Sequence, residues 1–193
     1  SFVVGIKSVK LSLKEKIFLK KFKPWGVILF SRNIKNILQT QKLTTEIRKI
    51  FKDKKYPILI DQEGGRINRL KNFISFDNLT SEFFGKKYKK NYSEFKFYYS
   101  LFIDKTSYLL NSIGVNINTS PVLDLRMKGC SNIIGDRSFS KDPKIVSKIG
   151  DFCINLFHKN GIGTVMKHIP GHGLAKVDSH FFKIIVKKNL KYL

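Results

Sequence analysis

Short apolar runs alternate with helical patterns along most of the 193 residues. Residues 27–30 and 56–60 are runs of strand length, typical of strands that are buried on both faces of a parallel sheet. Residues 1–6, 115–124 and 163–166 have a similar character, so the sequence predicts five strands. Strands that alternate with helices in this way are typical of a parallel sheet with crossover helices.

The intervals between these runs carry helix signals. Ser12 and Glu15 have the spacing of a capping box, and Asp142-Pro143 supplies an N-cap followed by a proline at the first helical position. Residues 71–91 have weak periodicity, and we expect a loop with at most a short helix there. Helices are predicted over residues 13–22, 36–51, 92–112 and 143–159.

The order of these elements predicts an α/β fold, namely an incomplete TIM-type (β/α)8 barrel with about the first five β/α units. A closed barrel needs eight strands and typically about 250 residues. Residues 1–193 are therefore expected to form the N-terminal part of a single barrel domain. An open, doubly wound sheet is the alternative, although no glycine-rich phosphate loop follows the first predicted strand.

Polar residues follow four of the predicted strands directly. The carboxyl ends of parallel strands meet at one edge, where ligands bind in such folds. Carboxylates accept hydrogen bonds from sugar hydroxyls, while Arg, Lys and His donate to ring and amide oxygens, so the set suits a polyhydroxylated ligand. The candidate residues are Asp61, Arg69, Asp124, Arg137, Lys167, His168, His172, Asp178 and His180.

Asp178 and His180 are two positions apart, so their side chains can pair in an extended loop. The carboxylate would then fix the imidazole tautomer, and the histidine could both give and take a proton near neutral pH. A helix N-cap beside an exposed histidine is the simpler alternative. A metal site formed with His168 and His172 is a further alternative, but the loop lacks the helical spacing of a zinc protease site, and we expect neither a metal nor a cofactor.

The formal net charge is +23, which would suit a polyanion-binding protein. The lysines are scattered through the predicted helices and loops, so we expect a generally basic surface and consider nucleic acid an unlikely partner. A non-catalytic basic module or a decayed gene product remains the alternative function. Cys130 and Cys153 are expected to be reduced thiols, and the absence of a signal peptide or an apolar span predicts a cytoplasmic protein without a membrane partner.

Several segments carry a resemblance that runs from near the first residue to the last. The chain resembles the bacterial β-N-acetylglucosaminidases, or β-hexosaminidases, of glycoside hydrolase family 3. The segments are GVILFSRNI (residues 26–34), IDQEGGRINR (60–69), NINTSPVLDL (116–125), IGDRSFSKDP (134–143) and KHIPGHG followed by DSH (167–180).

This resemblance implies a TIM-type barrel that releases terminal N-acetylglucosamine, with retention of configuration, from muropeptides or a related disaccharide during cell-wall recycling. It also implies that His180, oriented by Asp178, acts as general acid and base, where most retaining glycosidases use a second carboxylate. The residues that would hold the sugar by resemblance are Asp61, Arg69, Arg137, Lys167 and His168.

One motif of the family does not occur in this sequence. The family nucleophile is an aspartate in a Ser-Asp-Asp segment after a later strand, and no such segment is found in the 193 residues. We therefore expect this chain to bind N-acetylglucosamine weakly without turning it over. A barrel that lacks three strands leaves two unpaired edges, so self-association, aggregation or partial folding is also expected.

Overall fold

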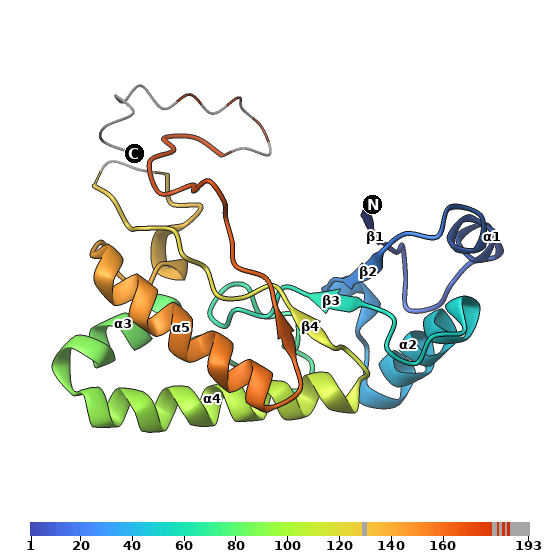
Figure 1. Ribbon diagram of the computed structural model, residues 1–193, viewed down its shortest axis with the longest axis horizontal. Coiled ribbons are helices and arrows are strands. Elements are labelled where there is room, and N and C mark those ends of the chain that lie inside the picture. The colour runs from blue at the N-terminus through green and yellow to red at the C-terminus, as the bar shows by residue number, and fades with distance from the viewer. Residues whose placement is uncertain (129–130, 179–180, 182, 184, 186–193) are drawn as a thin grey trace.

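The computed structural model describes residues 1–128, 131–178, 181, 183 and 185, and its centre is a parallel five-stranded sheet (Figure 1). The strands lie in the sheet in the order of the chain, and each pairs in parallel with the strand before it. Their bounds are β1 Val3–Gly5, β2 Gly26–Leu29, β3 Ile58–Ile60, β4 Ile117–Asn118 and β5 Gly163–Thr164.

Helices connect most of these strands (Figure 1). In the described part of the chain, α1 packs against α2, whereas α4 packs against both α3 and α5. There are also two short 3-10 turns. Ser31–Asn33 follows β2, and Gly135–Arg137 precedes α5. The α-helices are α1 Leu13–Phe22, α2 Ile37–Phe51, α3 Ser81–Lys90, α4 Tyr92–Ser112 and α5 Pro143–Lys159.

The helix starts predicted from the sequence are confirmed. The Ser12 hydroxyl accepts a hydrogen bond from the amide of Glu15, and the Glu15 carboxylate accepts one from the amide of Ser12 at 2.8 Å. The Asp142 carboxylate accepts from the amide of Lys144 at 2.9 Å, with Pro143 in the first turn. These bonds satisfy amides that have no partner inside the helix.

Two expectations need correction. The strands are shorter than the apolar runs, because β3 and β4 pair over only a few residues before their polar tips begin. Residues 81–90, where we expected a loop with a short helix, form the full helix α3, which Thr80 caps by accepting from the amide of Phe83. The apolar periodicity is weak there because the buried face of α3 includes Ser81 and Gly85.

The core lies between the sheet and the helices. Ile58 and Ile60 of β3 are completely buried, and Phe95 and Phe102 of α4 pack in the same cluster. Most aromatic side chains in the middle of α4 thus lie in the core, whereas Tyr98 and Tyr108 of the same helix are 46% and 65% exposed. Cys153 is also buried and free, and burial raises its pKa to about 12, whereas Cys130 lies outside the described residues.

The strand order confirms the barrel topology. A doubly wound sheet reverses its strand order at a switch point, whereas this sheet proceeds from β1 to β5 without a reversal. Within the described residues β1 and β5 each pair with one neighbour only, so the sheet is the open first part of a (β/α)8 barrel (Figure 1).

Candidate active site

The candidate site lies at the carboxyl ends of β3, β4 and β5. Asp61 follows β3 directly, Thr119 follows β4, and Lys167 comes three residues after β5. The pairing of β4 and β5 resumes beyond their regular parts, where Val122 bridges to Lys167. Parallel pairing therefore brings three side chains from distant parts of the sequence to one edge of the sheet.

The Asp61 carboxylate is contacted by residues that follow the other two strands, β4 and β5. Lys167 Nζ donates to Asp61 Oδ1 at 3.0 Å, and the Thr119 hydroxyl donates to the same oxygen. Arg69 Nη2 lies 3.7 Å from Asp61 Oδ2. Burial raises the pKa of Asp61, but Lys167, Thr119 and Arg69 together outweigh burial, so the pKa lies below its usual value and the group is a carboxylate at neutral pH.

Glu63 is the residue that links Arg137 to this group. Arg137 donates to both carboxylate oxygens of Glu63, at 2.8 Å from Nε and 2.9 Å from Nη2, and Lys167 Nζ lies 2.6 Å from Glu63 Oε1. The Glu63 side chain is only 3% exposed. Burial raises the pKa of Glu63, but the hydrogen bonds and charges of Arg137 and Lys167 outweigh burial and hold the pKa below its usual value, so Glu63 is also ionised.

Sequence reasoning did not select Glu63 as a site residue. A signal was present, because successive side chains of an extended segment point to opposite sides and residues two apart share a side. Asp61 and Glu63 share that spacing and both contact Lys167. Thr119 was also missed, and a lone threonine after a strand gave no comparable signal.

Gln62, between the two acids, holds the loop that carries Arg69. Its side-chain oxygen accepts from the amides of Arg69 and Leu70 at 2.9 and 3.1 Å. The backbone N–H of Gln62 donates to Asn118 Oδ1, and the side-chain amide of Asn118 donates back to the backbone carbonyl oxygen of Gln62 at 2.9 Å. The end of β4 thus fixes the turn after β3 and, through it, the start of the Arg69 loop.

Asp124 organises the segment that follows Lys167. Its side chain is completely buried, and it contacts His168 Nδ1 at 2.6 Å and accepts hydrogen bonds from the amides of His168 and His172. Burial raises the pKa of Asp124, but these bonds outweigh burial and hold it below its usual value. If Nδ1 donates to this carboxylate, the Nε2 atom of His168 is left for a ligand.

The structure therefore brings together Asp61, Arg69, Arg137 and Lys167 in one ion-pair network, with His168 on the segment next to it. Asp178 belongs to the described residues, and its carbonyl oxygen accepts from the amide of Phe181 at 3.2 Å. His180 lies outside the described residues. The expected pairing of Asp178 with His180 accordingly stays a prediction.

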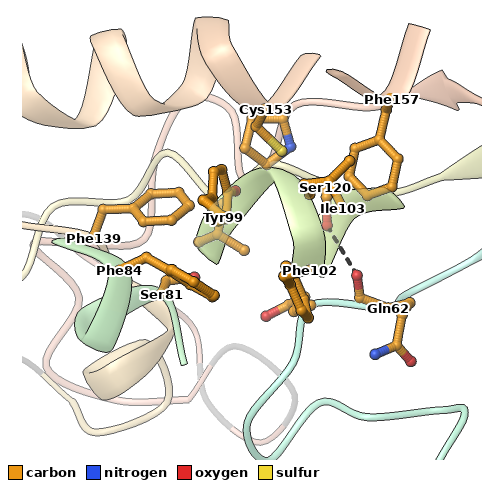
Figure 2. A pocket seen from close by; sticks show the side chains of 13 residues that line it. Gln62, Ser81, Phe84, Tyr99, Phe102, Ile103, Ser120, Phe139, Cys153 and Phe157 are labelled. Carbon is orange, nitrogen blue, oxygen red and sulfur yellow. Dashed lines mark hydrogen bonds between the residues drawn. The ribbon is translucent and has the colours of Figure 1, made fainter. Parts of the chain in front are cut away.

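Glu63 is also one of the residues that line a small cavity. Figure 2 shows this cavity with other side chains that line it. Its volume is about 10 Å³, roughly the space that one water molecule needs, so it cannot take a sugar. Aromatic side chains such as Phe84 and Tyr99 line it together with Gln62 and Ser120, whose hydroxyl donates to the Gln62 carbonyl oxygen at 3.3 Å. This cavity is therefore not a candidate sugar site.

The described residues contain no group of three or more His, Cys, Asp or Glu side chains arranged to hold a metal ion. Among the helices that the structure describes, none combines the length and the apolarity that crossing a bilayer requires.

The fold and the site together define the class of this protein, which is a partial (β/α)8 barrel with charged side chains at the carboxyl ends of its strands. The chain belongs to glycosyl hydrolase family 3, because residues 4–193 match the N terminal domain of that family. It is 37% identical over 183 residues to a beta-hexosaminidase of Hydrogenovibrio crunogenus, a match that covers 92% of this chain and 49% of the relative. A beta-hexosaminidase of Aromatoleum aromaticum is 35% identical, over 80% of this chain and 43% of the relative.

Solved structures agree with this placement. The chain superposes on native NagZ from Neisseria gonorrhoeae with a TM-score of 0.89 and 29% sequence identity, over 99% of this chain and 55% of that protein. The same protein in complex with N-trifluoroacetyl-D-glucosamine gives the same TM-score. The chain thus spans about half the length of the relatives it matches.

Proposed function

We propose that this chain is the sugar-binding part of a retaining glycoside hydrolase that releases terminal N-acetylglucosamine, a β-N-acetylhexosaminidase. The observation that carries the proposal is the network of Asp61, Glu63, Arg137 and Lys167 at the strand ends. It is supported by the family match, by relatives named beta-hexosaminidase, and by a similar structure that holds an N-acylated glucosamine.

In this proposal each group has a separate task. Asp61 accepts hydrogen bonds from sugar hydroxyls, while Arg69 and Arg137 donate to hydroxyl or acetamido oxygens through N–H groups that no described protein acceptor uses. Lys167 already contacts Asp61, Glu63 and Thr119. An ammonium group has three donors, so a sugar oxygen that binds Lys167 must replace one of these partners.

His180, oriented by Asp178, is the proposed general acid and base. An imidazole with a pKa near its ordinary value of about 6.5 can protonate the leaving oxygen and then deprotonate water. A retaining reaction also needs a nucleophilic carboxylate on the opposite face of the sugar. The carboxylates of Asp61 and Glu63 both form ion pairs with cationic side chains. We therefore propose that the nucleophile is not among these 193 residues and that the 193-residue chain does not complete the two-step reaction alone.

Muropeptides of the recycled cell wall are the proposed substrates, and the cytoplasm is the proposed location. Both rest on the resemblance of the sequence motifs to the cell-wall-recycling enzymes. A direct check is to compare a disaccharide muropeptide with N-acetylglucosamine as ligands of the purified chain.

Ligand-observed NMR on the 193-residue chain tests the sugar site. We expect saturation transfer to N-acetylglucosamine and much less to glucose, which lacks the acetamido group. Lys167→Met should weaken binding about tenfold or more, since a charged hydrogen bond contributes roughly 1.5–3 kcal/mol. Lys148→Met, on the exposed surface of α5, is the matched control and should bind like the unmodified chain.

Hydrolysis is tested separately with the p-nitrophenyl β-glycoside of N-acetylglucosamine. We expect no release of p-nitrophenol above background from residues 1–193. Sustained turnover would show that a carboxylate within these residues serves as the nucleophile, and absence of any N-acetylglucosamine binding would contradict the sugar-site proposal itself.

A further inference from the structure

Glu63 lies between two cations that have different origins in the chain. Arg137 comes from the turn before α5, and Lys167 comes from the segment after β5. Both reach the same buried carboxylate, at 2.6 to 2.9 Å. No other described carboxylate forms an ion pair with both residues.

The turn that follows Glu63 holds its side chain in this position. The Glu63 amide donates to the Ile67 carbonyl oxygen at 3.0 Å, so the turn that follows is closed. Gly64 has a φ of +89°, and a side chain there would lie 2.3 Å from the carbonyl oxygen of Leu79. The turn therefore requires glycine, and it holds Glu63 on the same side of the chain as Asp61.

The charges at this edge are balanced within the described ion pairs. Three cations, Arg69, Arg137 and Lys167, face the carboxylates of Asp61 and Glu63, and Asp124 adds a third carboxylate beside His168. An anion that approached Arg137 or Lys167 would meet a carboxylate within 3 Å of each cation. A neutral hydroxyl or amide oxygen accepts a hydrogen bond without that repulsion.

We infer that Glu63 is a specificity-determining residue, a fixed counter-ion that reserves Arg137 and Lys167 for an uncharged sugar and excludes anionic ligands such as sugar phosphates and uronates. The inference rests on the proposed sugar site for the identity of the favoured ligand. Its exclusion of anions depends only on the network itself. Glu63 acts through the two cations and does not need to touch the sugar.

Sulfate is a suitable probe because it is a small dianion. The 193-residue chain is titrated with sodium sulfate at constant ionic strength, and binding is followed through the Nε–H resonance of Arg137 and the ammonium resonance of Lys167. We expect no saturable shift in the unmodified chain. In Glu63→Gln the amide keeps the shape and removes the charge, and we expect sulfate affinity to rise on the order of tenfold or more.

Two further variants separate charge from fold. Glu63→Asp keeps the charge, so it should continue to exclude sulfate while losing the two-point contact with Arg137. Glu94→Gln removes a carboxylate that pairs with a lysine on the surface, and it should leave both resonances and sulfate binding unchanged. Circular dichroism spectra establish that each variant is folded.

The same samples are titrated with N-acetylglucosamine. We expect Glu63→Gln to bind the sugar at least about tenfold more weakly, because Arg137 and Lys167 lose their shared anchor. If Glu63→Gln gains sulfate but no sample binds the sugar, the sugar proposal fails and the role of Glu63 in excluding anions stands.

Two results would overturn the inference. One is a saturable sulfate shift at Arg137 and Lys167 in the unmodified chain, which can be measured even if Glu63→Gln does not fold. The other is a folded Glu63→Gln variant that excludes sulfate as the unmodified chain does. In that case Glu63 would stabilise the fold without selecting the ligand.

Discussion

At the scale of single residues, Asp124 holds the segment that carries Lys167 and His168. It is fully buried and accepts from two backbone amides besides its contact with His168. Asp124→Asn puts an amide donor against those N–H groups, so we expect a loss of about 3 kcal/mol or more in the free energy of unfolding. Urea denaturation measures it, with the exposed Asp151→Asn as control, and equal stabilities of the two variants would contradict the prediction.

The pH dependence of stability follows from the lowered pKa values of Asp61, Glu63 and Asp124. A carboxyl group whose pKa is lower in the folded chain stabilises the fold at pH values above the unfolded pKa, which is about 4. That stabilisation is lost as the pH falls through the folded pKa. We expect the urea midpoint to be constant from pH 7 to 5 and to fall below pH 4, whereas a rise below pH 4 would contradict this.

The sequence identified most of the ion-pair network but not its full membership. Asp61 and Lys167 could be found because each follows a predicted strand, and the carboxyl ends of parallel strands are where functional residues lie. The strand before Asp61 is buried as expected, whereas Val165 and Met166 before Lys167 are 39% and 48% exposed. Glu63 could be identified as a site residue only from its ion pair with Arg137, which lies 74 positions away in the sequence. Only the folded sheet brings those two residues together.

At the scale of elements, the packing of α3 depends on a glycine. A Cβ at Gly85 would lie 1.7 Å from the carbonyl oxygen of Phe139, whereas at Gly161 it would meet nothing within 4 Å. Gly85→Ala should therefore destabilise the chain by about 3 kcal/mol or more. Gly161→Ala should cost about 1 kcal/mol, because only its φ of +74° is unfavourable for alanine. Thermal unfolding of both variants tests this order, and a reversed order would refute it.

Elements with strong local signals were predicted closely. The helix at residues 13–22 has the expected bounds, and its start is encoded within four residues by the capping box of Ser12 and Glu15. The helix α3 was expected only as a possible short helix, because tertiary contact with the segment around Phe139, and not periodicity, determines its buried face. Short strands such as β4 are likewise set by pairing with their neighbours, which a single stretch of sequence does not reveal.

At the scale of the whole molecule, the two open edges of the sheet should govern association. Apolar side chains lie exposed on α1, the helix after β1, including Leu13 at 74% and Ile17 at 56%. We expect the 193-residue chain to associate in a concentration-dependent way, and Ile17→Lys to reduce the apparent mass measured by light scattering. Phe97→Lys is the control, because Phe97 is 65% exposed on α4, a helix between the inner strands β3 and β4. A monodisperse monomer at all concentrations would contradict the prediction.

The chain-order arrangement of the strands has a consequence for biosynthesis. Each strand finds its partner among residues that have already left the ribosome, so no strand from β2 to β5 has to wait for a later one. The loop-closure cost rises only slowly with loop length, so even the long connection between Ile60 of β3 and Ile117 of β4 adds little to it. The growing sheet can thus extend one strand at a time during translation, with its newest edge always ready for the next β/α unit.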